Sequence, residues 1–322
     1  LSIYSLGGSV EGQLFAPKTL VTKSSLFPKI QDIWSSWGCQ MRHDVIDVLS
    51  WAAVFNRGLE TDEVWRYMTS KSSIEDVEDC LAKMSGVERD QGRWYFTELE
   101  YGPTDYDRRK TAAEKQLRES LPIVSRLCEE EAVLGVSVTG SVASGLSQDD
   151  ADIDLMIITQ PNYVWRVRAL AVYLEHNANT ESRICPNMIL DCRNLELRPS
   201  VYAARELAMM RPVKGRVVFE KMITKNPWFQ EYLPNADLSA SFELPKPFGL
   251  LPFWWGVMRF PILGGMAEAW EARRRITKYT KSSKSIEAIY DRLRCIGHEN
   301  AHRSRIEERI TEILAEVSVD GK

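Results

Sequence analysis

Hydrophobic residues recur at helical spacing in the first third of the chain. Residues 41–55 carry their apolar side chains on one helical face, and Asn56–Gly58 ends that pattern. Two shorter helical segments follow, and two short β-like runs then flank the turn at Gln91-Gly92. Three short helices and a hairpin form the order of a winged helix. We predict a loosely structured lead-in over residues 1–30 and a winged-helix-like module over residues 31–104.

The third predicted helix of this module, residues 74–84, is acidic. It carries four acidic residues and one lysine. An acidic helix is a poor match for a groove lined with phosphates. The sequence therefore favours a structural or docking role for the module, with DNA binding as the alternative.

The pattern changes to strands in the middle of the chain, after a charged helix over residues 105–131. A helical segment over residues 163–175 precedes the last of these strands. The strands are predicted at residues 133–139, 153–159 and 187–191. This order predicts helices packed on a mixed sheet. The fold class is therefore α+β, with a core of mixed sheet and flanking helices at residues 105–235 and a helical C-terminal region at residues 236–322.

Two carboxylates stand at the start of the second predicted strand, in a segment otherwise suited to burial. Residues two apart in a strand project from one face, so Asp152 and Asp154 should lie side by side while Ile153 and Leu155 face the core. Adjacent carboxylates repel one another, and each is costly to bury alone. A divalent cation removes this conflict, and Mg²⁺ prefers carboxylate oxygens together with nucleotide phosphates.

The segment before these carboxylates has the composition of a phosphate-binding turn. Gly140 lets backbone amides approach an anion closely, Ser141 adds a hydroxyl donor, and a short helix follows. We assign Ser144 to the same site. The neighbouring Asp149 and Asp150 are interpreted as a solvated turn.

A strand, Gly140-Ser141, ten intervening residues and then Asp152-Ile153-Asp154-Leu155 form a pattern that resembles the polymerase-β-like nucleotidyltransferase superfamily. The resemblance is greatest to stand-alone nucleotidyltransferase-domain proteins of bacteria and archaea, and residues 130–195 carry it. Residues 202–216 and 226–236 also look like the downstream segments of such proteins. The resemblance implies transfer of a nucleoside monophosphate from a nucleoside triphosphate to an acceptor, with release of pyrophosphate.

The resemblance also implies a third carboxylate on the following strand. Asp191 is the candidate, because Asn187, Ile189 and Asp191 share one face of the predicted strand. Two Mg²⁺ or Mn²⁺ ions would then be held by Asp152, Asp154 and Asp191, and Asp191 would lie nearest the acceptor. The alternative is that Asp191 caps a turn. In that case the chain is a nucleotide-sensing regulator without chemistry, whose winged helix binds DNA or a protein partner.

Basic residues are needed to neutralise the triphosphate. Arg166 and Lys214 follow the predicted core strands and are our candidates for nucleotide binding. A second basic run, residues 271–284, includes Tyr279 among its lysines and arginines. This run is the only local feature that favours a nucleic-acid acceptor. The net charge of −4 favours a small molecule or a protein hydroxyl as acceptor over RNA.

Two other features of the sequence contribute less to the functional prediction. HENAH, residues 298–302, matches the zinc-protease pattern HExxH, but the helix around it is polar and only 20 residues follow. The most apolar stretch, residues 248–270, has the length of a membrane span. Pro252, Arg259, Pro261 and a Gly-Gly pair interrupt it, so we predict a buried helix and turn with no membrane span, with contact to a membrane surface as the alternative.

The cysteine pattern bears on the cellular compartment. Six cysteines are scattered along the 322 residues without a CxxC pair, which indicates neither a zinc ribbon nor a disulfide framework. The chain also starts without a secretory signal pattern. We therefore expect a reducing, cytoplasmic setting.

Overall fold

The computed structural model describes residues 40–97, 105–149, 151–178, 183–247, 249–282, 288–297 and 302–320. The chain divides into two compact units, residues 1–40 and 41–322. The predicted lead-in belongs to the first unit and lies outside the described residues. Apart from Gln40, the described residues all belong to the second unit.

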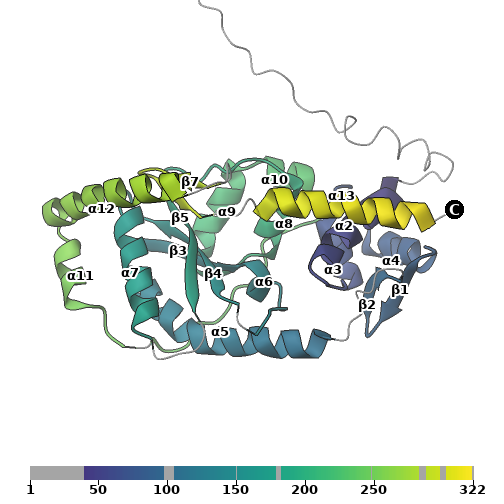
Figure 1. The fold of residues 1–322 in the computed structure, drawn as a ribbon, viewed down its shortest axis with the longest axis horizontal. Coiled ribbons are helices and arrows are strands. Elements are labelled where there is room, and N and C mark those ends of the chain that lie inside the picture. Colours follow the sequence, from purple (N-terminus) through teal and green to yellow (C-terminus); the bar gives the residue numbers. More distant parts are fainter. Residues whose placement is uncertain are drawn as a thin grey trace, which may run out of the picture. The chain divides into compact units, whose positions relative to one another are not determined.

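The second unit begins with three helices and a two-stranded hairpin, the order expected from the sequence (Figure 1). Their bounds are α2 Gln40–Val54, α3 Thr61–Tyr67, α4 Ile74–Ala82, β1 Val87–Asp90 and β2 Arg93–Phe96. Ser73 caps α4 by accepting a hydrogen bond from the Asp76 amide at 3.2 Å. The acidic residues Glu75 and Asp79 on α4 are exposed, so the helix presents a negative face.

A six-stranded mixed sheet forms the centre of the unit, with strand order β6-β3-β4-β5-β8-β7. Its strands are β3 Val133–Thr139, β4 Ile153–Thr159, β5 Ile184–Asp191, β6 Arg211–Lys214, β7 Ile289–Tyr290 and β8 Arg294–Ile296. Strands β4 and β5 pair in parallel, and the other described neighbours pair antiparallel. The protein is therefore of the α+β class, as predicted.

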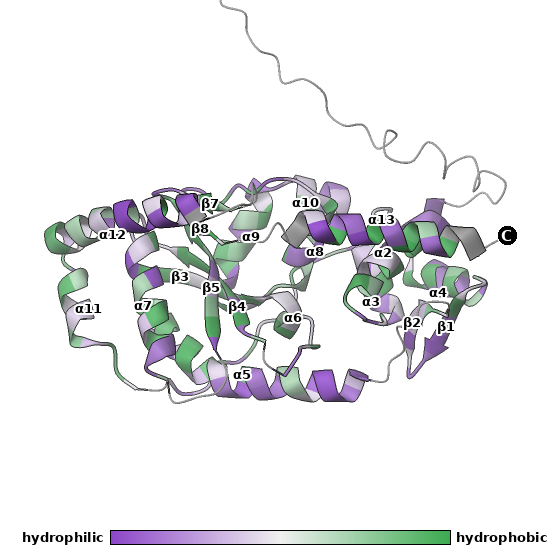
Figure 2. Ribbon diagram, in the orientation of Figure 1, coloured by the Kyte–Doolittle hydropathy of each residue, from purple (hydrophilic) through white to green (hydrophobic). Residues whose placement is uncertain are grey.

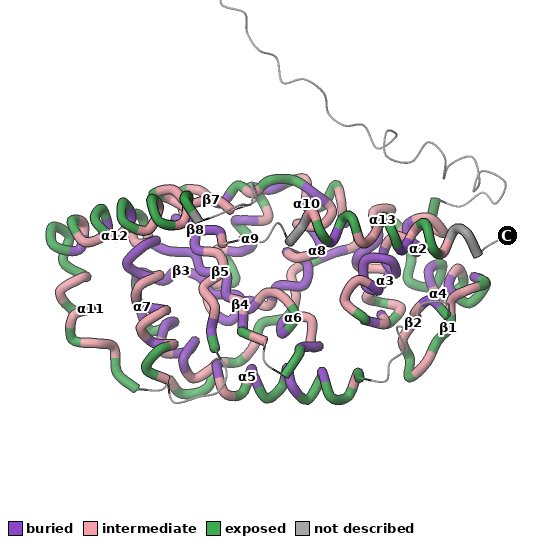
Figure 3. The backbone as a smooth tube through the Cα atoms, viewed as in Figure 1, coloured by how far each residue is buried: buried purple, intermediate pink, exposed green. Residues whose placement is uncertain are grey.

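Helices α5 (Tyr106–Cys128) and α7 (Val164–His176) pack on this sheet and enclose its main core. Val136, Leu155, Ile157, Trp165 and Leu170 are fully buried there. Figure 3 shows β3 and β4 as a largely buried centre, and Figure 2 shows the same strands as hydrophobic. Consecutive residues of both strands are buried, because both faces of this part of the sheet are covered.

The remaining helices are shorter or lie later in the chain. They are α6 Gly140–Ala143, α8 Val201–Met209, α9 Arg216–Lys225, α10 Trp228–Tyr232, α11 Phe253–Met258, α12 Pro261–Ser282 and α13 His302–Asp320. The region predicted to be helical also contributes β7 and β8. These strands were missed because they are only two and three residues long and form by pairing, β8 with β5 and β7 with β8.

The prediction that residues 248–270 are buried is wrong for most of the segment. Helix α12 packs on α7 through a narrow face that includes Gly264, Glu268 and Ala272, which are buried. Phe253 is 94% exposed and Ile262 is 78% exposed. None of the helices in the described ranges is long and apolar enough to cross a membrane.

Candidate functional site

A cavity of about 630 Å³ lies where the central strands β3, β4 and β5 face α2, α5 and α8. Gly140, Ser141 and Ser144 line it, together with Asp154 at the start of β4. The other polar residues of its lining include Asn187, Glu206, Arg57 and Arg109. The cavity thus joins the predicted phosphate-binding turn to one of the predicted metal-binding carboxylates.

The turn at Gly140 requires glycine for two reasons. Its φ is +67°, which other L-residues rarely adopt, and a Cβ added there would lie 2.7 Å from the Asp154 Oδ2 atom. The neighbouring Thr139 pairs with Asp154 in the β3–β4 ladder. The turn and the carboxylate are therefore held against each other by the sheet itself.

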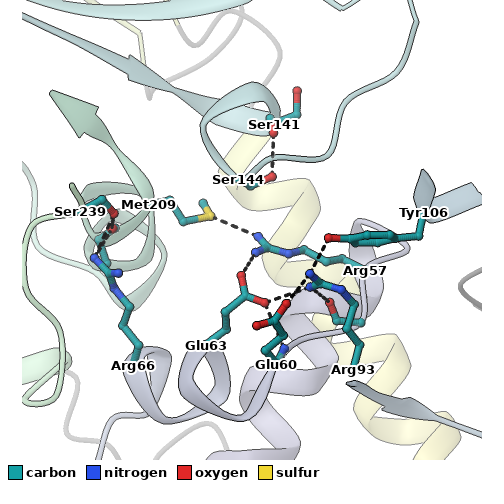
Figure 4. A network of polar contacts seen from close by, with 12 residues as sticks. Arg57, Glu60, Glu63, Arg66, Arg93, Tyr106, Ser141, Ser144, Met209 and Ser239 are labelled. Atoms are coloured by element: carbon teal, nitrogen blue, oxygen red, sulfur yellow. Dashed lines mark hydrogen bonds and ion pairs between the residues drawn. The ribbon is translucent and has the colours of Figure 1, made fainter. Parts of the chain in front are cut away.

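The two serines of the turn are organised differently. Ser144 donates its hydroxyl hydrogen bond to the Ser141 carbonyl at 2.7 Å (Figure 4). Ser141 is exposed, and its hydroxyl lies 3.4 Å from that of Ser147. Ser144 therefore shapes the turn, whereas Ser141 keeps a hydroxyl that can reach a ligand.

Asp152 and Asp154 influence one another through their charges. Burial and, to a smaller extent, the negative charge of Asp152 together raise the pKa of Asp154 to about 6. The Cys185 thiol, on the adjacent strand, donates a hydrogen bond that opposes this shift. Asp152 itself is exposed, one residue before β4. The charge of Asp152 thus disfavours ionisation of Asp154, which is the repulsion expected from the sequence.

A second acidic group of the cavity lining, Glu206 on α8, was not predicted. Burial, with a further contribution from the charge of Asp154, raises its pKa to about 7, and a hydrogen bond with Tyr202 opposes the shift. The sequence signal was one glutamate in the largely apolar residues 201–209, directly after Arg205. A single helical glutamate carries little information until the fold places it near another carboxylate.

Asp191 does not lie with the other two predicted carboxylates. In the parallel β4–β5 pair, Asp154 is opposite Cys185, whereas Asp191 is opposite Thr159 at the far end. Five residues separate these positions along β4, or about 16 Å. This corrects the predicted metal site, because the structure does not bring Asp152, Asp154 and Asp191 together. Because β5 runs parallel to β4, its last residue, Asp191, lies at the end of the pair opposite Asp154, which stands near the start of β4.

Asp191 is instead engaged in contacts that hold the fold together. It is fully buried and accepts hydrogen bonds from the backbone amides of Asn162 and Arg193, at 2.8 and 3.0 Å. The Arg193 guanidinium pairs with it at 2.8 Å. These contacts hold the pKa of the Asp191 carboxyl below its ordinary value despite burial. The alternative interpretation, a strand-end aspartate that caps a turn, describes this arrangement.

The two predicted nucleotide-binding cations also lie elsewhere. Arg166 is buried between α7 and α12, where it pairs with Glu268 at 3.6 Å and donates to the Asn162 carbonyl at 2.8 Å. Lys214 donates to the carbonyls of Cys128 and Glu130, at 2.6 and 3.0 Å. Both cations therefore satisfy internal acceptors, and neither lines the cavity.

Arg57 and Arg109 supply the positive charge that the sequence did not reveal. Both are more than nine-tenths buried, and each Nε atom lacks a hydrogen-bond partner among the described residues. Arg57 pairs with Glu63 and directs its Nη1 atom to the Met209 sulfur at 3.8 Å (Figure 4). Arg109 donates to the Asn56 carbonyl at 2.7 Å. Burial and the neighbouring Arg57 charge lower the pKa of Arg109.

The structure also locates the other residues and motifs that the sequence singled out. Asp149 pairs with Arg108 at the surface, and Asp150 lies outside the described residues. Most of HENAH also lies outside them. Within the described ranges no group of three or more His, Cys, Asp or Glu residues could hold a metal ion. Tyr279 stacks on Trp165 with ring centroids 6.4 Å apart, so this face of its ring is already covered.

Comparison of the chain with protein-family models, with curated proteins and with solved structures gave no match.

Substitution of Glu206 should change how stability depends on pH. A carboxyl whose pKa is raised in the folded state, here from 4.5 to about 7, stabilises the fold only while it is protonated. The stabilisation that the protonated Glu206 carboxyl contributes is complete below about pH 4.5 and is lost as the pH rises through 7. Glu206→Gln should therefore gain about 3 kcal/mol over the parent between pH 4 and pH 8.

Urea denaturation at both pH values, with a chelator present, measures this difference. Glu231→Gln, at an exposed site on α10, is the control and should track the parent. A Glu206→Gln curve parallel to that of the parent would contradict the assignment.

Proposed function

We propose that the chain is a metal-dependent nucleotidyltransferase of the polymerase-β-like type. It would transfer a nucleoside monophosphate from a nucleoside triphosphate to an acceptor. The observation that carries the proposal is the contact between the turn and the carboxylate. Gly140 lies so close to Asp154 that a Cβ has no room, and both line one cavity with Ser141. A ligand bridging them would need a phosphate at one end and a cation at the other.

The residues present fit one divalent cation bound together with the substrate. Mg²⁺ is usually held by one or two carboxylates and completes its shell with phosphate oxygens and water. Asp152 and Asp154 would hold it, and their mutual repulsion is what a cation relieves. When bound, the cation supplies charge neutralisation at the triphosphate. Asn187 lines the cavity on β5 with a carboxamide, so the sheet does not provide the third carboxylate there.

The cavity residues have distinct roles in this proposal. The Ser141 hydroxyl and the close-packed backbone at Gly140 would receive the phosphates, and Arg57 and Arg109 would balance their charge from another part of the lining. Glu206 would accept the proton of the acceptor hydroxyl. A pKa of about 7 suits that task near neutral pH.

The bonds and charges balance in the proposed transfer. The acceptor oxygen forms a bond to the α-phosphorus, and the bond from that phosphorus to the oxygen bridging it to the β-phosphate breaks. Pyrophosphate leaves, and the acceptor proton passes to the Glu206 carboxylate. A small molecule or a protein hydroxyl is favoured as acceptor over RNA, because the net charge of the chain is −4 and the exposed face of α4 is acidic.

The second candidate function is a nucleotide-sensing regulator without chemistry. The observation that favours it is the place of Asp191, which leaves the sheet without its expected third carboxylate at the site. A regulator would still bind the nucleotide at the same turn. Both functions therefore predict nucleotide binding, and only the enzyme predicts turnover of the nucleotide.

Nucleotide binding should raise the thermal stability of the chain only when Mg²⁺ is present. A ligand at one hundred times its Kd adds about 2.7 kcal/mol to the folded state. Each of the four nucleoside triphosphates, with and without Mg²⁺, should be compared by differential scanning fluorimetry. The pair of variants Gly140→Ala and Gly145→Ala provides the test, because Gly145 also has a positive φ but faces open space.

The Gly140→Ala variant should lose the ligand-induced shift, whereas Gly145→Ala should keep it. An α-³²P-labelled triphosphate incubated with cell extract then separates the two functions. Label transferred to an acceptor supports the enzyme, and binding without transfer supports the regulator. No shift with any triphosphate would overturn both.

A further inference from the structure

Exposed apolar side chains gather on the hairpin formed by α11 and α12. Nine large hydrophobic residues are exposed in the described part of the chain, and seven of them fall between residues 250 and 270. Such a concentration is unusual, because exposed apolar residues are normally scattered singly. We call six of them the hairpin tip: Phe253, Phe260, Ile262, Leu263, Met266 and Trp270. Their exposed fractions range from 54% to 94%.

Phe260, Ile262 and Leu263 lie at the turn of the hairpin, and Phe253 and Trp270 lie further along α11 and α12. The turn between α11 and α12 is at the left edge of the ribbon in Figure 1, and Figure 3 shows the first turns of α12 as largely exposed. Helix α12 is attached to the rest of the fold along its other side. Glu268 accepts hydrogen bonds there from the backbone amides of Trp165 and Arg166, at 2.9 and 2.8 Å. The apolar face is therefore held outward by a fixed attachment.

Basic residues continue the same face of α12 beyond the tip. Arg273 lies seven residues after Met266 and three after Trp270, so the three share one side of the helix. Lys281 lies seven residues after Arg274, which itself follows Trp270 by four, so both continue that side. Arg273, Lys278 and Lys281 are exposed and take part in no ion pair within the described residues. The acids of this segment are already neutralised.

Two glutamates account for that neutralisation. Glu268 is buried and pairs with Arg166. Glu271 pairs with Arg274 and Arg275, at 2.8 and 2.6 Å. The exposed face of α12 therefore changes along its axis from apolar at the N-terminal end to net positive at the C-terminal end.

We propose that the α11–α12 hairpin docks the protein on an anionic lipid surface. The hairpin tip would enter the boundary between headgroups and acyl chains, and Arg273, Lys278 and Lys281 would lie at the level of the headgroups. Interfacial helices bury their apolar side about 5–10 Å into this boundary.

The charge order favours a lipid surface over a protein partner. A bilayer offers an apolar layer directly below a negative one, and the hairpin presents apolar and positive surfaces in the same sequence. The aromatic residues Phe253, Phe260 and Trp270 suit the interface, where Trp and Phe side chains are favoured. This proposal is independent of the nucleotide site, because it rests on a different face of different helices.

Vesicle flotation with the full chain tests the proposal. Phosphatidylcholine vesicles should be compared with vesicles containing one quarter phosphatidylglycerol, and the protein should partition more strongly to the anionic ones. The tip variant Ile262→Ser/Leu263→Ser/Met266→Ser changes only exposed side chains. It should lower the partition coefficient at least about tenfold. Val217→Ser, at a 75% exposed site on α9, is the matched control and should bind as the parent does.

The charge contribution needs its own variant. Arg273→Gln/Lys278→Gln/Lys281→Gln should reduce partition to anionic vesicles on the order of a hundredfold, since each basic residue near such a surface contributes about fivefold. Binding to phosphatidylcholine vesicles should not change. Circular dichroism and urea midpoints equal to those of the parent show that each variant folds.

Three results would overturn the proposal. The unmodified chain fails to float with anionic vesicles, or the tip variant floats as well as the parent. In the third, sedimentation velocity shows that the parent protein self-associates and that the tip variant is monomeric, while neither protein binds vesicles. That result would assign the hairpin tip to contacts between copies of the chain.

Discussion

Asp154→Asn is expected to reduce pyrophosphate release on the order of a thousandfold, which corresponds to about 4 kcal/mol at the transition state. The substitution keeps the shape of the side chain and removes the charge that would hold the cation against the Gly140-Ser141 turn. It also relieves the repulsion from Asp152, which contributes to the raised pKa of Asp154. Folding stability above pH 6 should therefore be equal to that of the parent or higher.

Asp149→Asn provides the control for this measurement. Asp149 is an exposed acid five residues before Asp154, and it pairs with Arg108 outside the cavity. Its removal should leave pyrophosphate release within about twofold of the parent. Coupled-enzyme detection of pyrophosphate, with the acceptor found by labelling, measures both variants. Full activity in Asp154→Asn would exclude the proposed nucleotidyltransferase mechanism.

Asp191→Ala should lower the free energy of unfolding by about 3 kcal/mol or more. Asp191 is fully buried, and its loss would leave the amides of Asn162 and Arg193 without their acceptor. Binding of nucleoside triphosphate should remain unchanged, because Asp191 lies at the opposite end of the β4–β5 pair from Asp154. Urea denaturation and the nucleotide-dependent thermal shift measure the two properties separately.

Glu220→Ala is the matched control for stability. Glu220 pairs with Arg216 at 3.1 Å on the exposed face of α9. Such surface pairs contribute about 0–1 kcal/mol. A stable Asp191→Ala variant that no longer responds to Mg²⁺ and nucleotide would return Asp191 to the metal site and contradict the strand register.

Strands β3 and β4 and the first half of the site could be anticipated from local patterns. A run of apolar and β-branched residues is a property of each strand alone, so β3 and β4 were found where expected. The spacing of Asp152 and Asp154 is equally local, since residues two apart in a strand share a face. The positive φ at Gly140 follows the same logic, because a turn between adjacent strands favours glycine.

Asp191 shows where local patterns fail. The alternation of Asn187, Ile189 and Asp191 gave no information about the register of β5 against β4. Direction and register depend on how two separate segments pair, and β5 runs parallel to β4. The last residue of β5, Asp191, therefore lies at the end of the pair opposite Asp154, where the sequence pattern had not placed it.

The remaining groups of the site became visible only in three dimensions. Arg57 follows α2, Arg109 lies on α5 and Glu206 lies on α8, so the three come from segments far apart in the chain. The shifted pKa values of Arg109 and Glu206, and the unpaired Nε donors of the arginines, arise from burial that no single segment encodes.

By itself, the sequence determined the strands β3 and β4, the glycine turn and the pair Asp152 and Asp154, because each of these follows from interactions between residues close in the chain. Only the tertiary structure decided that Glu206 and Arg109 join Asp154 in one cavity, that Asp191 does not, and that the apolar hairpin tip remains exposed. The physical reason is that burial and charge coupling depend on long-range packing. The same apolar run of residues can fill a core or face outward, according to which side of the helix the sheet and α7 leave uncovered.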